Sequence, residues 1–191
     1  MEDDKVTISR AAYSVTYPAS FMLVCAMNPC RCGFLGHPTK ACKCTPNDID
    51  RYVGKISGPL LDRIDIQIEV PAVSYGDLTN QNRGESSTQI KERVNRARQI
   101  QQDRYKGTGI SCNANINTDM IRRYCSLTQS ASQLLQTIFE KLTLSARGYD
   151  RILKVARTIA DLKGHDNIHD DDIAEASQYR ALDKKYFHSH R

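Results

Sequence analysis

Over residues 5–17 (KVTISRAAYSVTY), apolar and polar side chains alternate, which is the period of a β-strand with one exposed face. The alternation is interrupted near Arg10 to Ala12, so we expect a β-hairpin that turns there. The next segment, residues 21–27 (FMLVCAM), is apolar at every position. That pattern is typical of a strand buried on both faces of a mostly parallel sheet. It ends at Asn28-Pro29, an ordinary turn signal.

Two further elements are predicted before residue 72. Residues 48–56 favour a short helix that Gly58-Pro59 ends, and apolar residues alternate with polar ones over residues 64–70, as in a half-buried edge strand. Pro71 closes that strand. Residues 1–72 are therefore predicted to form part of an α/β domain.

Residues 73–84 are polar and predict a linker, and helical patterns follow it. Ser86 and Gln89 form a capping box for a helix with Ile90, Val94 and Ala97 on one face. Ser130 and Gln133 predict a second capping box. The expected helices cover about residues 86–106, 118–125, 130–142, 145–163 and from 170 onward. Gly164 is expected to end the helix at 145–163, whose apolar stripe consists of Ile152, Val155, Ala156, Ile159 and Ala160. The predicted fold class is thus α/β plus α, with residues 85–191 forming a helical bundle.

The charge along the chain is mildly basic and uneven. The 191 residues carry 27 Lys and Arg against 22 Asp and Glu, and the segment from Lys91 to Lys106 holds six basic residues against two acidic ones. Such a run is either a solvated helix face or a contact to a phosphate backbone. No apolar run approaches the ~20 residues of a membrane span, and no signal peptide is recognisable, so we expect a soluble cytoplasmic protein without a membrane partner.

Four of the seven cysteines lie between residues 28 and 46 as two Cys-x-Cys pairs: Cys30, Cys32, Cys42 and Cys44. In a reducing compartment, clustered thiols favour a metal site over disulfides, and four thiolates are the ligands of structural Zn²⁺. Gly33, Gly36 and Pro38 let the intervening loop turn back. Free thiols, disulfides and an iron–sulfur cluster remain alternatives, as does His37 in place of one thiolate. The remaining cysteines, Cys25, Cys112 and Cys125, are expected to be small core residues.

Two polar residues stand where an anion would be stabilised. Arg147 falls in the first turn of its helix, where the helix dipole repels a cation, so either a carboxylate or a bound phosphate is expected beside it. Asn28 follows the predicted buried strand, at the edge where open α/β sheets bind ligands.

In their order along nearly the whole chain, five features resemble one family. These are AMNPC, the Cys-x-Cys pairs, GPLLDRIDI, SARGYDRILKVARTIADL and EASQYR, and they resemble the C-terminal part of the magnesium-chelatase-like AAA+ ATPases, the ComM family of competence proteins. The chain departs from the family's NPCPCG at Arg31, where proline is expected.

The resemblance implies roles for single residues. Asn28 corresponds to the sensor 1 residue that orients the attacking water, Arg63 to the arginine finger presented to a neighbouring subunit, and Arg147 to the sensor 2 arginine of the helical lid. An exposed ion pair with Asp62 or Asp65 is the alternative for Arg63. The hairpin corresponds to the presensor hairpin.

The motifs that bind nucleotide are not in the sequence. No Gly-x-x-x-x-Gly-Lys-Ser/Thr occurs, Gly54-Lys55 is followed by Ile, and no apolar strand ends in an Asp-Glu pair. We therefore expect a fragment, inactive alone, whose parent combines it with the N-terminal remainder of the same ATPase, binds ATP and Mg²⁺, and assembles into a hexamer acting on DNA.

Two other functions remain open. The parent could be the motor subunit of a magnesium chelatase, or the chain could be a zinc-dependent nucleic-acid-binding module without enzymatic activity. Basic candidates for a DNA contact are Arg10 at the expected hairpin turn and Arg96 and Arg98 in the basic run.

Overall fold

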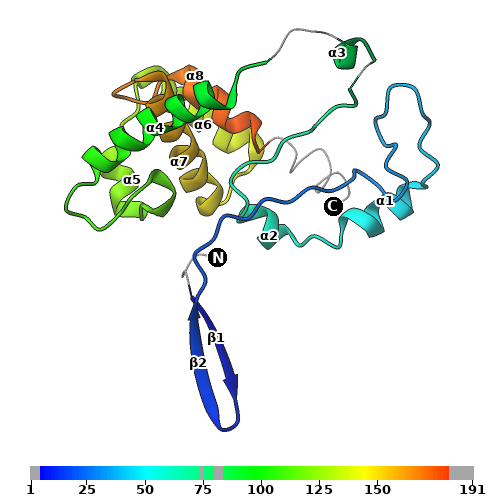
Figure 1. The fold of residues 1–191 in the computed structure, drawn as a ribbon, viewed down its shortest axis with the longest axis horizontal. Helices are drawn as coiled ribbons and strands as arrows, with labels where there is room; N and C mark the ends of the chain where they lie inside the picture. The colour runs from blue at the N-terminus through cyan, green and yellow to red at the C-terminus, as the bar shows by residue number, and fades with distance from the viewer. Residues whose placement is uncertain (1–4, 74, 80–83, 181–191) are drawn as a thin grey trace. The chain divides into compact units, whose positions relative to one another are not determined.

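The computed structural model describes residues 5–73, 75–79 and 84–180, and the chain divides into two compact units, Met1–Pro59 and Leu60–Arg191 (Figure 1). The first unit holds a β-hairpin, the cysteine loop and a short helix. The second holds the helical bundle. None of the helices in these described ranges is both long and apolar enough to cross a bilayer.

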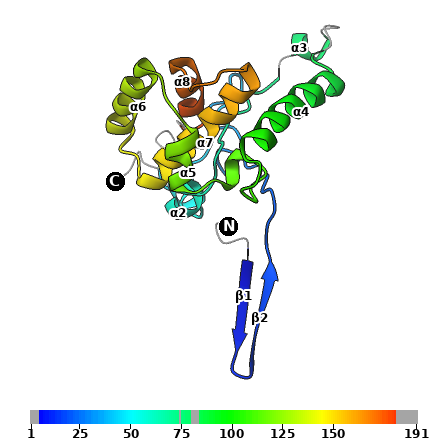
Figure 2. The ribbon, with the colours of Figure 1, turned by 90° about the vertical axis from the view of Figure 1, so that its left-hand side faces the viewer.

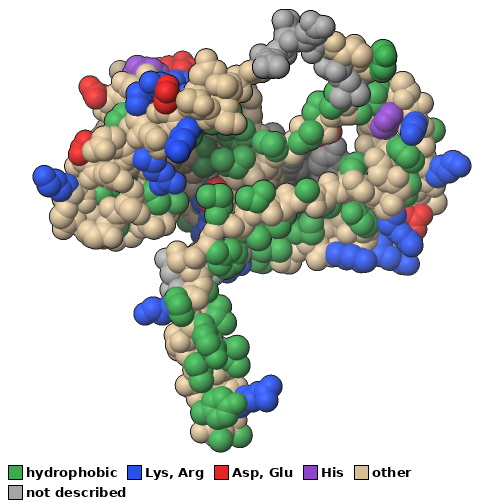
Figure 3. Space-filling model, viewed as in Figure 1, with side chains coloured by type: hydrophobic (Ala, Val, Ile, Leu, Met, Phe, Trp, Pro, Cys, Tyr) green, Lys and Arg blue, Asp and Glu red, His purple; other side chains and the backbone are tan. Residues whose placement is uncertain are grey.

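The hairpin is formed by the antiparallel strands β1 (Lys5–Arg10) and β2 (Tyr13–Pro18), which confirms the predicted turn at Ala11-Ala12 (Figure 2). Ile8 pairs with Val15, and Arg10 pairs with Tyr13. Because side chains alternate between faces, the register places the apolar residues on one face and the Ser and Thr residues on the other. All residues of both strands are exposed, so neither face of the hairpin is buried. Figure 3 shows apolar side chains along the hairpin.

The buried strand predicted for residues 21–27 is absent. This segment has no regular secondary structure and its side chains are exposed, with Met22 and Val24 each 83% accessible. A strand buried on both faces needs hydrogen-bonded neighbours on both edges. Among the described residues the hairpin is the only sheet, so no neighbouring strand is present to pair with this segment.

The predicted edge strand over residues 64–70 is also absent, for the same physical reason. The helix predicted at 48–56 is confirmed as α1 (Pro46–Val53), which Thr45 caps through a capping box with Asp48. Gly58-Pro59, which was expected to end this helix, begins the next helix, α2 (Gly58–Asp62), instead. Part of the predicted linker forms α3 (Tyr75–Thr79), while residues 74 and 80–83 lie outside the described residues.

The helices after residue 84 follow the predicted order. They are α4 (Ser87–Arg104), α5 (Thr118–Tyr124), α6 (Gln129–Leu142), α7 (Ala146–Lys163) and α8 (Asp170–Gln178), with the short 3₁₀-helix η1 (Asn113–Asn115), which was not predicted, between α4 and α5. The capping box of Ser86 and Gln89 is confirmed. The box predicted at Ser130 is wrong, because Thr128 caps α6. On α4, Ala97 is buried as expected, but Ile90 and Val94 are each 43% exposed.

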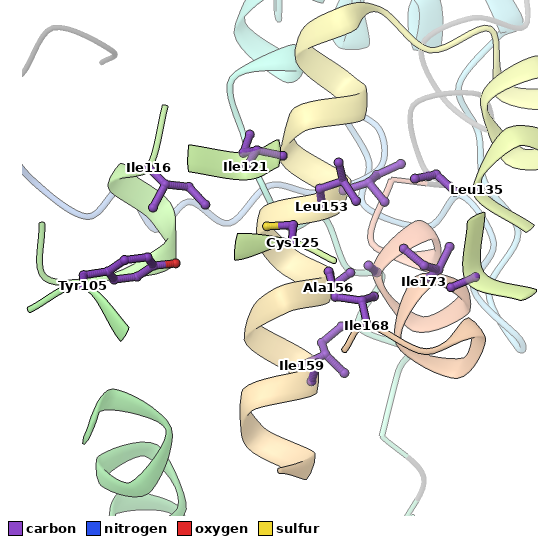
Figure 4. Close-up of a cluster of buried hydrophobic side chains, with 14 residues drawn as sticks. Tyr105, Ile116, Ile121, Cys125, Leu135, Leu153, Ala156, Ile159, Ile168 and Ile173 are labelled. Carbon is purple, nitrogen blue, oxygen red and sulfur yellow. The ribbon is translucent and has the colours of Figure 1, made fainter. Parts of the chain in front are cut away.

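Helix α7 is the centre of the bundle and packs against α4, η1, α5 and α8. Figure 4 shows side chains of α7 meeting those of the neighbouring elements in one cluster. The predicted stripe on α7 is confirmed, with Ile152, Ala156 and Ala160 fully buried. Gly164 ends the helix in the left-handed conformation at φ 79°, which lets the chain turn back into α8.

A buried carboxylate lies within this core and connects several of its elements. Asp161 on α7 accepts hydrogen bonds from Arg104 of α4 at 2.5 and 2.8 Å, from Arg157 Nε at 3.1 Å and from Asn113 Nδ2 at 2.8 Å. Two arginines and an amide thus satisfy one buried anion, and they join three helical elements at a single point.

Candidate functional site

The cysteine loop brings its four thiols together. Its turns are made by glycines with positive φ, Gly33 at 79° and Gly36 at 78°, and the Gly33 N–H donates to the Cys30 carbonyl at 3.0 Å. A side chain at these positions would be strained, so the glycines expected to reverse the loop do so. Cys30 is buried, and the other three cysteines are half-buried.

The sulfur geometry fits a tetrahedral metal. The Sγ atom of Cys30 lies 3.4 Å from that of Cys32 and 3.7 Å from that of Cys42, and the Cys32 and Cys42 sulfurs are 3.5 Å apart. With Cys44 included, all four sulfurs lie within 4.8 Å of one another. A tetrahedral Zn²⁺ with Zn–S bonds of about 2.3 Å separates its sulfurs by about 3.8 Å. Disulfide-bonded sulfurs would be about 2.05 Å apart, so these cysteines are free thiols.

The thiols also influence one another's ionisation. Backbone N–H groups of Phe34 and Lys43 lower the pKa of Cys32 to about 6. The backbone N–H of Cys44 lowers the pKa of Cys42, but burial and the sulfurs of Cys32 and Cys30 outweigh it and raise that pKa to about 12. One thiolate therefore forms readily and its neighbours resist a second charge, and a divalent cation would remove that resistance.

His37 does not join the cluster. Its Nδ1 accepts hydrogen bonds from the backbone N–H groups of Thr39 at 3.2 Å and Lys40 at 3.1 Å, and its ring packs edge-on against Phe34. The metal-ligand group found at this loop is made by the four cysteines alone, so the alternative of a histidine ligand is not supported.

The first unit has little hydrophobic core to hold this loop. Among its described residues, the buried apolar side chains are Cys30 and Val53. Cys25 is exposed, contrary to the expectation of a core residue, whereas Cys125 in the second unit is buried as expected and Cys112 is half-buried. A unit with so small a core needs another source of stability, and a bound metal is a common one.

Asn28 and Arg10, two predicted contact residues, also belong to the first unit. Asn28 is exposed and lies beside the cysteine loop, with its Nδ2 3.7 Å from the position that a Cβ on Gly33 would take. Arg10 is exposed at the end of β1, where it pairs with Tyr13 across the turn.

In the second unit, the segment around Arg63 is held by two arginines, one on α7 and one just after α8. Arg180 donates to the Ile64 carbonyl at 3.0 Å and lies 3.4 Å from Asp62, and Arg151 of α7 pairs with Asp65. The Gln67 N–H also donates to the Tyr179 carbonyl at 2.9 Å. We call Arg151 and Arg180 the arginine clamp.

Sequence reasoning missed the arginine clamp. The partners of Asp62 and Asp65 lie 118 and 86 residues further along the chain, a separation that no periodicity reveals. Arg180 is 3% exposed, so its charge is buried against this segment. The clamp therefore binds one acidic residue on each side of Arg63, Asp62 before it and Asp65 after it. Arg63 itself is half-buried.

The other predicted residues of the second unit lie on exposed helix surfaces. Arg147 is in the first turn of α7, one helical turn before the clamp residue Arg151, and that turn contains no carboxylate of its own. Arg96 and Arg98 are exposed on α4 and flank the buried Ala97.

The family models that match the chain are those of magnesium chelatase subunits. Residues 1–78 match the model described as magnesium chelatase, subunit ChlI, and residues 84–180 match the model for the ChlI C-terminal part. The chain belongs to this magnesium-chelatase-like family.

Several curated bacterial proteins are similar to this chain over nearly its whole length. Competence protein ComM of Haemophilus influenzae is 44% identical over 95% of this chain, and YifB of Salmonella typhimurium and YifB of Escherichia coli are each 38% identical over 98% of it. The chain spans about a third of the length of these relatives, covering 35% of ComM and 36% of either YifB.

Removing one arm of the arginine clamp tests whether it orders the Arg63 segment. In Arg180→Ala, we expect amide hydrogen exchange at Ile64 and Gln67 to rise about tenfold or more, because a buried charge-assisted contact is lost. Arg123→Ala, an exposed arginine on α5, is the control and should leave these amides unchanged. Unchanged exchange in Arg180→Ala would show that the clamp does not hold the segment.

Proposed function

We propose that this chain is the C-terminal part of an AAA+ ATPase and supplies the groups that respond to a bound nucleotide, while the N-terminal remainder binds it. The observation that carries the proposal is the arginine clamp, because it links helix α7, on which Arg147 lies, to the segment that bears Arg63. The family membership supports the same conclusion.

In this proposal each polar group acts on a nucleotide held elsewhere in the assembly. Asn28 orients the attacking water, Arg147 contacts the phosphates from the lid, and Arg63 reaches the nucleotide of a neighbouring subunit in a hexamer. An arginine that neutralises charge growing in the transition state accelerates phosphoryl transfer without binding the ground state strongly. ATP and Mg²⁺ belong to the full-length parent, which is expected to work in the cytoplasm.

Because Arg147 and Arg151 lie one turn apart on α7, a movement of the lid helix would be transmitted to the Arg63 segment through Asp65. A subunit that senses its own nucleotide through Arg147 would thereby adjust the finger it offers to the next subunit. This coupling is a consequence of the clamp and needs no further contact.

The four cysteines are proposed to hold a structural Zn²⁺. Four thiolates close the coordination shell and leave no position for substrate, so the ion would staple the loop rather than take part in catalysis. The small core of the first unit supports this role.

DNA is the proposed partner of the motor, and the exposed basic side chains of Arg10, Arg96 and Arg98 support it. These residues would contact the phosphate backbone, which carries no sequence information. The relative named competence protein ComM favours DNA over the porphyrin substrate of a magnesium chelatase.

Elemental analysis tests the zinc proposal. We expect about one zinc per chain in the purified protein, and its loss from the Cys42→Ser/Cys44→Ser double variant, because a closed site needs all four thiolates. The Cys25→Ser/Cys112→Ser double variant removes the same number of thiols outside the cluster and should keep its zinc. Metal-free protein with an ordered loop would contradict the proposal.

Turnover in the full-length protein tests the arginine roles. Arg63→Ala should lower kcat by about 10³ to 10⁵ and leave nucleotide affinity nearly intact, as for other arginine fingers. Mixing it with a P-loop variant should restore some activity, whereas Arg147→Ala should weaken both binding and turnover. The exposed Arg122→Ala is the control. Ordinary turnover in Arg63→Ala, or ATP hydrolysis by the 191-residue chain alone, would show that the roles are misassigned.

Salt dependence tests the DNA contact. Raising the salt from 50 to 200 mM lowers DNA affinity, and three phosphate contacts account for a factor of roughly 40 in that loss. Without these contacts, the loss of affinity should be smaller by this factor. We therefore expect the triple charge reversal of Arg10, Arg96 and Arg98 to weaken binding to labelled DNA and flatten its salt slope. Charge reversal of Arg122 and Arg123 matches two of these changes on α5, and the proposal fails if it has the same effect per charge.

A further inference from the structure

We propose that His165, His169 and Asp171 form a second metal site, open to solvent, that binds a divalent transition-metal ion at the turn between α7 and α8. One ligand atom from each residue lies within 4.8 Å of the other two. Two imidazoles with one carboxylate make a donor set that suits Zn²⁺, Ni²⁺, Co²⁺ or Cu²⁺. The site belongs to the second unit and is independent of the cysteine cluster.

The two histidine rings are stacked face to face. Their centroids are 4.2 Å apart with an interplanar angle of 15°. Ligand atoms around a four-coordinate metal with bonds of about 2.05 Å are roughly 3.3 Å apart, so these atoms must approach by at most ~1.5 Å. The stacked rings must also turn so that their in-plane lone pairs point to one metal ion. His165 and His169 are half-buried and Asp171 is exposed, which gives the side chains room for that movement.

A buried carboxylate orients one of the imidazoles. Asp172 has no exposed side-chain surface, and its Oδ2 lies 3.0 Å from Nδ1 of His165 and accepts the His169 N–H at 3.0 Å. When the Nδ1–H group of His165 donates a hydrogen bond to Asp172, Nε2 carries no proton and its lone pair is available to a metal. Carboxylates placed behind a ligating histidine in this way are the usual means of fixing its tautomer and orientation.

The backbone of the turn is fixed before any metal arrives. Arg157, 1% exposed, donates to the carbonyl of His165 at 2.5 Å and to that of Asp166 at 2.7 Å. The Ile168 N–H donates to the Ser126 carbonyl at 2.8 Å. A site whose supporting shell is rigid loses little conformational freedom when it binds its ligand.

Charge around the turn also favours a cation. From Lys163 to Glu175 the chain holds five carboxylates and one lysine. Lys163 lies 2.9 Å from Asp171, 3.0 Å from Asp172 and 3.3 Å from Glu175, so it engages one oxygen of Asp171 and retains other partners if a metal draws that residue away. Figure 3 shows histidine side chains next to acidic ones on the helical unit.

Calorimetric titration with Ni²⁺ tests the site. The 191-residue chain is first given one equivalent of Zn²⁺, enough to fill only the four-cysteine cluster. The background variant is His188→Gln/His190→Gln, which removes two further imidazoles from the chain. We expect one further equivalent of Ni²⁺ to bind, and His165→Gln or His169→Gln to weaken it at least tenfold. Asp172→Asn should weaken it about 10- to 100-fold. Asp170→Asn is the matched control, since it removes a neighbouring charge outside the ligand group, and should change the affinity less than twofold.

Paramagnetic Co²⁺ provides a readout that does not depend on these substitutions. Bound at the site, it should broaden the NMR signals of Ile168 and Ile173, which lie among and just after the ligand residues in the chain. Absence of a further equivalent, equal Ni²⁺ binding by the His165→Gln/His169→Gln variant, or broadening that spares Ile168 and Ile173 would overturn the proposal.

Discussion

The bundle depends on the buried anion of Asp161. Arg104 from α4, Arg157 from α7 itself and Asn113 from η1 all donate to this carboxylate. Removing one member of a buried ion pair typically costs about 3–5 kcal/mol, because the remaining charge is left without a partner. Arg157 extends the same network to the carbonyls of His165 and Asp166, so the carboxylate that joins the helices also fixes the turn into α8.

The arginine clamp works at the other end of α7. Arg151 and Arg180 hold residues on both sides of Arg63, and the Gln67 backbone completes the attachment. Surface ion pairs contribute little stability, but Arg180 is buried and bonds a carbonyl as well as a carboxylate, so its geometry is specific. Helix α7 thus carries three features along its length: the exposed Arg147 at its start, the clamp residue Arg151 one turn later and the core network near its end.

The first unit is organised differently. Its hairpin exposes both faces and residues 21–27 expose an apolar run, so hydrophobic burial contributes little among its described residues. Four thiols converge there at distances suited to one metal ion, and a bound ion would supply stability that packing does not.

The sequence by itself determined what depends on neighbouring residues. The hairpin turn, the capping box at Ser86, the stripe and Gly164 end of α7, and the cysteine group follow from short-range spacing, and the structure has them all. It did not determine residues 21–27 and 64–70, because strand patterns become strands only where partners pair with them, and the described residues hold none. The arginine clamp was decided by tertiary structure, since its contacts join residues 86 and 118 positions apart, which meet only when the helices pack. The burial of Asp172 behind His165 depends on the same packing.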